Sequence, residues 1–217
     1  MIIIYKPYEL EINMKSSVIA RGAEAIITKQ GSIITKNRIE KSYRHPQLDI
    51  KIRKLRTRSE AKILEKAIKI IPTPKVIGSD ETRNTIELEY IPGKKLAESL
   101  EKTNFKKVCK KIGNNLAKIH DNNIIHGDLT TSNMILNEKE NKVYFIDYGL
   151  GFQSSRIEDK AVDLHLIKQA LEAKHPTIYQ EAFKSVIEGY KKQSKTAKQV
   201  ISQLEKVERR GRYKAQY

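Results

Sequence analysis

The chain has 217 residues, enough for one domain or two closely packed lobes, and its hydrophobic content of 39% is sufficient for a buried core. Lys and Arg number 42 against 26 Asp and Glu, and the net charge of +16 favours a polyanionic partner, although scattered lysines also suit a merely solvated surface. A single cysteine, Cys109, excludes an intramolecular disulfide and a cysteine-based metal cage, and is expected to be a small core side chain.

Residues 1–16 mix apolar and charged side chains without a clear period, and are interpreted as an edge strand or an extension. Their apolar start is too short for a signal peptide, and no stretch approaches a membrane span, so we expect a cytoplasmic protein. Strands are predicted from Ser17 to Lys36, with a turn at Gln30-Gly31. Between two of them lies Gly22-Ala23-Glu24-Ala25, where a glycine lets backbone N–H groups approach phosphates, although a plain hairpin turn is the alternative.

A long helix is predicted from Leu48 to Lys69, because apolar residues recur at three- and four-residue steps. Glu60 lies on or beside this apolar stripe, where a carboxylate needs a partner. We expect that partner to be Lys36, at the end of an apolar strand. A surface pair of Glu60 with Arg56 is the alternative.

Two prolines, Pro72 and Pro74, end the helix, and an antiparallel pair of strands is predicted at residues 76–78 and 85–90. Pro92-Gly93 then breaks the chain. A small β-rich lobe of residues 1–91 is therefore expected to precede a helical lobe of residues 92–217.

The second half of the chain is predicted to be mainly helical. His120 is interpreted as a helix-end histidine, and Asp163, a carboxylate among apolar positions, either braces the loop at residues 126–133 or lies exposed on its helix. The predicted helices are Leu96–Leu100, Phe105–His120, Glu158–Ala173, Ile178–Tyr190 and a last one containing Val200–Val207.

A polar loop between apolar segments carries the strongest signal in the sequence. His126-Gly127-Asp128 and Asn133 follow the pattern H-x-D-x-x-x-x-N, and Asp147-Tyr148-Gly149 follows the next apolar strand. This is the layout of a kinase catalytic loop and of the D-F-G metal site. In that layout Asp128 accepts the proton of the attacking group, while Asn133 and Asp147 hold divalent metal beside the phosphates of ATP.

The loop also departs from eukaryotic protein kinases. Gly127 stands where they carry an arginine that senses a phosphorylated activation loop, and only a short segment without A-P-E follows Asp147. Thr130, two residues after the proposed base, stands where Ser/Thr protein kinases usually have a lysine. We therefore expect no phosphorylatable activation loop and poor phosphorylation of ordinary protein substrates.

Four further segments resemble the small atypical kinase of the KEOPS complex, the Bud/PRPK family, which is RIO-like. The resemblance extends from about Arg21 to Arg212. It implies an α+β, minimal protein-kinase-like fold and a Ser/Thr kinase or ATPase that uses ATP and Mg²⁺ or Mn²⁺. The segments are Gly22-Ala23-Glu24-Ala25, Tyr43-Arg44-His45-Pro46, Arg56-Thr57-Arg58-Ser59-Glu60-Ala61 and Arg210-Gly211-Arg212.

The resemblance also implies partners and roles for individual residues. A Kae-type, Gcp-like subunit and the other KEOPS subunits would be the partners, in making threonylcarbamoyladenosine on tRNA. Lys36 and Glu60 would form the ion pair on ATP, beside Gly22, Ala23, Glu24 and Ala25. The backbone from Glu89 to Ile91 would bind adenine.

Two other functions remain open at the level of sequence. One is a small-molecule phosphotransferase of the aminoglycoside or choline type, which would need an acidic, roomy substrate pocket. The other is a binding module whose ATP site only switches its conformation. Turnover of ATP, measured with and without partner and tRNA, separates the three.

The sequence closes on a basic segment with two nearby tyrosines, Tyr213 and Tyr217. It is expected beyond the last helix, with no acidic residue to pair with locally, and to contact tRNA phosphates. A functionless chain end is the alternative. The cations are Arg209, Arg210, Arg212 and Lys214.

Overall fold

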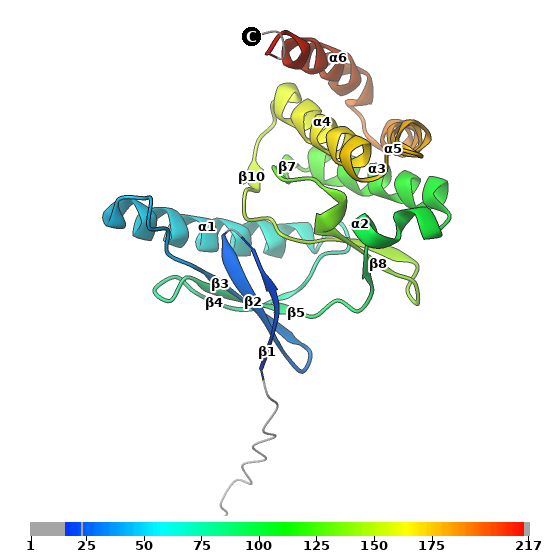
Figure 1. Cartoon of the computed structure of the whole chain (residues 1–217). Coiled ribbons are helices and arrows are strands. Elements are labelled where there is room, and N and C mark those ends of the chain that lie inside the picture. The colour runs from blue at the N-terminus through cyan, green and yellow to red at the C-terminus, as the bar shows by residue number, and fades with distance from the viewer. Residues whose placement is uncertain (1–15, 23, 215–217) are drawn as a thin grey trace, which may run out of the picture.

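The computed structural model describes residues 16–22 and 24–214, with side chains described as far as Arg210. The edge strand or extension expected at residues 1–16 falls almost wholly outside this part of the chain. The described residues form an α+β fold with the two lobes of a protein kinase: a sheet-bearing N-lobe and a helical C-lobe (Figure 1). The boundary at residue 91 stays a prediction.

The N-lobe is built on a five-stranded antiparallel sheet with the order β1-β2-β3-β5-β4. The strands expected between Ser17 and Lys36 are confirmed, and the third continues to Arg38. Lys36 lies in the middle of the sheet, with Ile27 opposite it on one side and Ile86 on the other. The strands are β1 Ser17–Arg21, β2 Ala25–Gln30, β3 Ile33–Arg38, β4 Val76–Asp80 and β5 Thr85–Glu89.

Helix α1, Pro46–Ala67, begins two residues earlier than expected, because proline is well suited to a first helical turn. The helix contacts β4 and β5 of the sheet and β10, Phe152–Gln153, of the C-lobe. In Figure 1 it lies between the sheet and the helical lobe, and its first turns extend beyond both. Its buried face carries Glu60 toward β3.

The C-lobe is a bundle in which α3 packs on α5 and α4 packs on α6. Two glycines allow α3 and α5 to approach each other closely. A Cβ on Gly113 would collide with the Val186 carbonyl, and a Cβ on Gly189 would collide with the Lys110 carbonyl. Cys109 is fully buried on α3, as expected. The helices are α2 Leu96–Ser99, α3 Phe105–Asp121, α4 Ile157–Lys174, α5 Tyr179–Gln193 and α6 Ala197–Lys214, with short 3₁₀ turns at Leu100–Lys102 and Thr131–Asn133.

Short strands at the edge of the C-lobe fix the loops that face the N-lobe. The order in one sheet is β6-β8-β9, and β7 pairs with β10. The Phe145 N–H donates to the Pro72 carbonyl at 3.0 Å, which links this sheet to the connection after α1. The strands are β6 Lys94–Lys95, β7 Ile124–Ile125, β8 Met134–Asn137 and β9 Lys142–Phe145.

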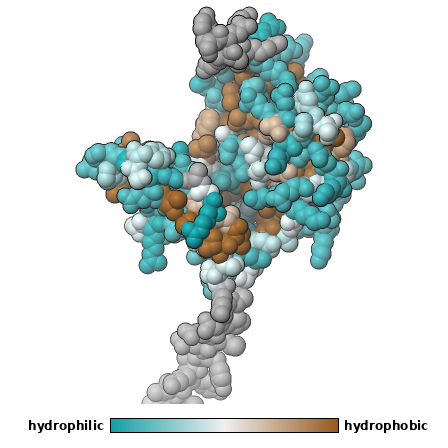
Figure 2. Space-filling view, in the orientation of Figure 1, coloured by the Kyte–Doolittle hydropathy of each residue, from teal (hydrophilic) through white to brown (hydrophobic). Residues whose placement is uncertain are grey.

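Most of the C-lobe surface in the view of Figure 2 is hydrophilic, whereas apolar residues gather over β1. There Val18 and Ile19 are half exposed. Among the described residues, none of the helices combines the length and the apolar character needed to cross a membrane.

Candidate active site

A buried cluster of charges joins the sheet to α1. Lys36 Nζ donates to Glu60 Oε1 at 2.9 Å and to Asp147 Oδ1 at 2.6 Å. Arg38 Nη2 donates to Glu60 Oε2 at 2.5 Å. Glu60, fully buried, therefore has a cation on each oxygen. The ion pair expected between Lys36 and Glu60 is present, and its role toward ATP stays a prediction.

Arg38 was not anticipated from the sequence, although a signal was available. It lies two residues beyond Lys36 on β3, and alternate residues of a strand face the same side of a sheet. A second cation was therefore to be expected next to the first. The alternative partner of Glu60, Arg56, was wrong: its Nη1 lies 2.8 Å from Glu24 Oε2 instead.

The turn between β1 and β2 is held by hydrogen bonds and by arginines. The Gly22 N–H donates to the Ala25 carbonyl at 2.9 Å, and Arg44 Nη2 donates to Glu24 at 3.2 Å. Burial tends to raise the pKa of Glu24, but the charges of Arg56 and Arg44 outweigh it and hold the pKa below its usual value. The ionised Glu24 side chain thus forms ion pairs with Arg44 and Arg56. Ala23 lies outside the described residues.

The proposed base and one proposed metal ligand are hydrogen-bonded to each other. Asn133 Nδ2 donates to the Asp128 carbonyl at 2.9 Å and to Asp128 Oδ2 at 3.0 Å. The amide nitrogen is thus occupied by Asp128, and the amide oxygen Oδ1 is the Asn133 atom available to a cation. A 3₁₀ turn at Thr131–Asn133 brings the two residues together across their five-residue spacing.

A carboxylate on α4 holds the start of this loop. Asp163 Oδ2 accepts from the His126 N–H at 2.7 Å, and Oδ1 accepts from the Gly127 N–H at 2.9 Å. The expectation that Asp163 braces the loop is confirmed. His120 is more than a helix-end histidine, because it is fully buried between Asp163, at 3.2 Å, and the Tyr190 hydroxyl, at 2.9 Å.

The side chain of His126, at the start of the catalytic loop, is fully buried. Burial lowers the pKa of His126, and the neighbouring charge of Asp163 offsets this only in part. A neutral ring is therefore favoured at pH 7. Its Nε2 lies 3.1 Å from the Ile146 carbonyl, next to Asp147, and its ring lies 4.4 Å from that of Tyr148, measured between centroids.

Gly127 has a structural reason for lacking a side chain. Its φ of +77° lies in the left-handed region, and a Cβ there would collide with the Leu150 carbonyl. An arginine at this position would require the segment after Asp147 to move. That segment is short, since α4 begins at Ile157.

Asp147 adopts a left-handed conformation with φ of +62°, which turns its carboxylate back toward the sheet. Its Oδ1 accepts from Lys36 and, at 3.2 Å, from the Gly149 N–H. Burial tends to raise the pKa of Asp147, but the Lys36 charge and hydrogen bond outweigh it, so the pKa lies below its usual value. The ionised carboxylate suits a role as metal ligand.

Two cavities lie between the lobes. The first, of about 240 Å³, is lined by β-strand residues, by Glu89, Tyr90 and Ile91, and by Asn133 and Asp147. The second, of about 370 Å³, reaches from Gly22, Glu24 and Ala25 to Asp128 and Asp147. The structure thus brings together around one cleft all the described residues predicted for nucleotide, base and metal.

The terminal segment differs from the expectation. The backbone of α6 continues to Lys214, so Arg209 and Arg210 belong to the helix rather than to a tail beyond it. Arg210 has a partner on another helix, because its Nη1 donates to Glu158 Oε1 on α4 at 2.5 Å. The sequence indicated no partner for these cations nearby in the chain, and the partner of Arg210 is instead supplied by the packing of α4 against α6. The side chains of Arg212 and Lys214 lie outside the described part.

Comparison with known proteins agrees with this geometry. Residues 23–167 match the protein kinase domain family. Fold, catalytic loop and sequence match together define the chain as a protein kinase domain. ATP and a divalent metal are what this class of site uses in general.

Individual relatives show which family of protein kinases the chain belongs to. The chain is 42% identical to the KEOPS complex subunit Bud32 of Pyrococcus abyssi, over 84% of each protein. It is 39% identical to the EKC/KEOPS complex subunit bud32 of Dictyostelium discoideum, over 91% of this chain and 83% of that one. A probable bifunctional tRNA threonylcarbamoyladenosine biosynthesis protein of Methanobrevibacter smithii is 39% identical, over 93% of this chain but 38% of its own length. The chain belongs to the Bud32 family.

The residues present suit a divalent metal. Asn133 and Asp147 both line the first cavity and offer an amide oxygen and a carboxylate, the hard donors that Mg²⁺ and Mn²⁺ prefer. No group of three or more His, Cys, Asp or Glu side chains that could hold a metal occurs in the described part of the chain. Two protein ligands are nonetheless sufficient where phosphate oxygens complete the coordination.

Proposed function

We propose that this chain is an atypical Ser/Thr kinase or ATPase that acts as the kinase-like subunit of a KEOPS complex in tRNA threonylcarbamoyladenosine modification. The main support is Lys36, which bonds both to Glu60 on α1 and to Asp147 beside the same cavity. The names of the relatives support the complex and the tRNA pathway. The proposed partners are a Kae-type, Gcp-like subunit, the other KEOPS subunits and tRNA, and the proposed location is the cytoplasm.

In the proposed complex the adenine of ATP occupies the first cavity. The backbone N–H groups of Glu89 and Tyr90 already donate to the carbonyls of Lys75 and Ser32, at 2.9 and 2.8 Å. The hydrogen bond from protein to adenine is therefore assigned to the backbone N–H of Ile91. Lys36 turns from Asp147 to the α- and β-phosphates, and Gly22, Glu24 and Ala25, which line the second cavity, lie beside the phosphates.

Asn133 Oδ1 and the Asp147 carboxylate would hold the metal, which we propose to be Mg²⁺ or Mn²⁺. When bound, such an ion neutralises negative charge on the phosphates as the phosphoryl group is transferred. Glu60 keeps Arg38 as a partner while Lys36 contacts phosphate. Ion pairing of the buried carboxylate therefore persists through nucleotide binding.

Asp128 acts as the base. An oxygen of a Ser or Thr hydroxyl, or of water, attacks the γ-phosphorus as its proton passes to Asp128, and the bond to the β–γ bridging oxygen breaks with its electrons leaving on ADP. Asn133 donates to Oδ2 of Asp128. The other carboxylate oxygen thus remains available to the proton.

ATP turnover, measured for the chain alone, with its Kae-type partner, and with partner and tRNA, tests this function. We expect turnover in the wild type, stimulation by the partner and tRNA, and loss of turnover in folded Asp147→Ala. ATP binding without turnover in every mixture would instead establish a nucleotide-switched binding module. Near-normal turnover in Asp147→Ala would refute the role of Asp147.

A further inference from the structure

The two cavities of the cleft meet at a narrow set of residues. The first cavity contains the segment proposed to bind adenine, and the second alone is lined by Asp128. A nucleotide whose γ-phosphate reaches Asp128 must therefore lay its triphosphate across the junction. The residues that line both cavities are Ala20, Ile27, Lys36, Lys95 and Asp147.

Two of these junction residues are lysines, and they come from opposite lobes. Lys36 projects from β3 of the N-lobe sheet, whereas Lys95 is the second residue of β6 in the C-lobe. Lys36 already bonds to Glu60 and Asp147. For Lys95 Nζ the described residues provide no ion pair and no hydrogen bond, so its charge is available to a ligand.

The backbone of Lys95 is held firmly beside the catalytic loop. Lys95 pairs with Ile135 on β8, two residues after Asn133, and its carbonyl accepts from the Ser99 hydroxyl at 2.9 Å. One small sheet thus positions both this lysine and the proposed metal ligand.

The site lacks a cation where many Ser/Thr kinases have one. Thr130 stands two residues after Asp128, so the catalytic loop supplies no lysine to the transferred group. Arg38 and Arg56 line the second cavity but are paired with Glu60 and Glu24. The triphosphate carries about four negative charges, of which a divalent metal and Lys36 offset about three.

We propose that Lys95 binds the triphosphate of ATP from the C-lobe side, opposite Lys36. The inference rests on the proposed nucleotide site. In it, Lys95 on β6 supplies the positive charge beside the phosphates that the catalytic loop does not provide. It makes Lys95 a nucleotide-binding residue that recognises phosphate rather than adenine.

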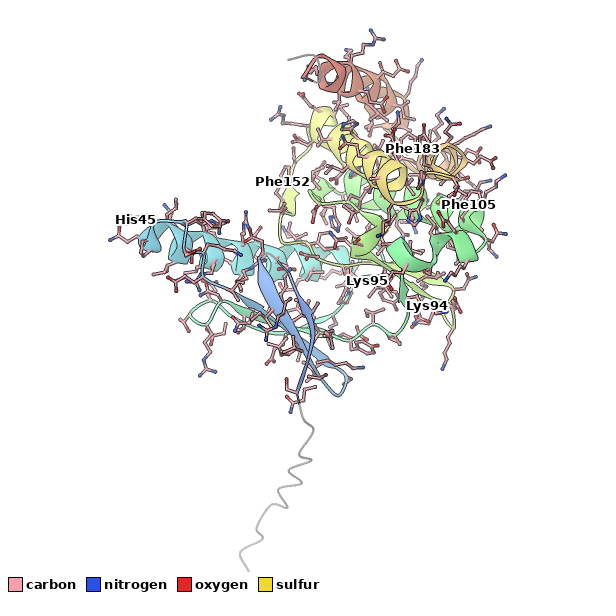
Figure 3. The ribbon with its side chains drawn as sticks, viewed as in Figure 1. His45, Lys94, Lys95, Phe105, Phe152 and Phe183 are labelled. Carbon is pink, nitrogen blue, oxygen red and sulfur yellow. The ribbon has the colours of Figure 1, made fainter. Side chains whose placement is uncertain are left out.

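The chain contains a matched control next to Lys95. Lys94 carries the same charge on the same strand, but consecutive strand residues face opposite sides, and Lys94 lines neither cavity. Figure 3 labels both lysines beneath α2, with Lys95 the nearer to the strands of the N-lobe. Replacing either one changes the net charge equally.

The experiment measures binding of ATP with Mg²⁺, and of adenosine, to the full chain and to Lys95→Met, Lys95→Arg and Lys94→Met. Because a charge-assisted hydrogen bond is lost, Lys95→Met should weaken ATP binding about tenfold and leave adenosine binding unchanged. Lys95→Arg should keep most of the ATP affinity, and Lys94→Met should bind like wild type.

Three results would overturn the proposal: unchanged ATP affinity in Lys95→Met, equal losses in Lys95→Met and Lys94→Met, or a parallel loss of adenosine affinity. The first would exclude a phosphate contact, the second would indicate only long-range charge, and the third local damage to the adenine site. Failure of the proposed function is distinguishable, because wild-type protein that binds ATP without turning it over still yields all these affinities.

Discussion

Asp163 on α4 accepts a hydrogen bond from the Gly127 backbone N–H at 2.9 Å, so a helix of the C-lobe core fixes the backbone next to the proposed base. The same carboxylate accepts from the His126 N–H at 2.7 Å. Both N–H groups precede Asp128 directly. The position of the base is thus determined by packing of α4 rather than by the loop alone.

Replacing Asp163 with alanine should destabilise the protein by about 3 kcal/mol, because the N–H groups of His126 and Gly127 and the His120 ring lose a buried acceptor. Urea unfolding measures this change. Glu172→Ala, at an exposed position of the same helix, should stay within about 0.5 kcal/mol of wild type. Equal stabilities of the two variants would show that Asp163 does not brace the loop.

Interactions that follow from the pattern of one strand or one helix could be predicted from the sequence, whereas interactions that depend on how distant elements pack could not. The Lys36–Glu60 pair was predictable, because an apolar stripe with one carboxylate and a strand ending in lysine leave few other partners. Strand periodicity could have added Arg38. The packing of His120 on Tyr190 could not be predicted, since it depends on how two helices cross.

The fold shows the same difference between what local sequence patterns predict and what tertiary packing decides. The helices and the N-lobe strands followed from local patterns, with boundaries differing by a few residues, whereas the two-residue strands β6 and β10 were not predicted. The extension of α6 through Arg209 was missed because consecutive arginines resemble a solvated tail, while helix formation there accompanies the ion pair of Arg210 with Glu158. Tertiary partners of charged residues decide such boundaries.

Replacing Asp128 with asparagine should lower kcat about 10²- to 10⁴-fold while leaving ATP affinity near that of wild type. The amide oxygen of the variant can still accept from Asn133 Nδ2, so the loop geometry is retained and proton acceptance is lost. Single-turnover kinetics and nucleotide titration measure the two quantities. Lost affinity with retained turnover would refute the role of Asp128 as base.

The free energy of unfolding should decrease as the pH falls below about 6.5. Burial lowers the pKa of His126 in the folded state, so just below the unfolded pKa of 6.5 the unfolded chain binds more protons and becomes favoured. The loss ends once the pH passes the lower, folded pKa. Denaturant unfolding from pH 7.5 to 5.5 measures this slope.

His126→Gln should flatten that pH dependence without abolishing it. His175 contributes in the same direction, because burial lowers its pKa and the charge of Glu101 offsets this incompletely. The double variant with His175→Gln should be flatter still. An unchanged slope in the double variant would assign the effect to other groups.

Deleting residues 209–217 should lower tRNA affinity and reduce its dependence on salt, because four cations near the end of α6 are lost. For each phosphate contact removed, the slope of log affinity against log salt concentration should become less steep by about 0.7 to 0.9. ATP binding should be unchanged, since every proposed nucleotide residue lies upstream. The measurement is tRNA affinity across a salt series, with the Kae-type partner present.

The deletion also breaks the ion pair of Arg210 with Glu158, so that loss needs its own control. Glu158→Ala breaks the same pair but keeps the arginine and frees it for phosphate. If the cations contact tRNA, Glu158→Ala should bind at least as tightly as wild type while the deletion binds more weakly. Superimposable salt curves for wild type and deletion would exclude this segment as an RNA contact, and equal weakening of both variants would point to the helix packing instead.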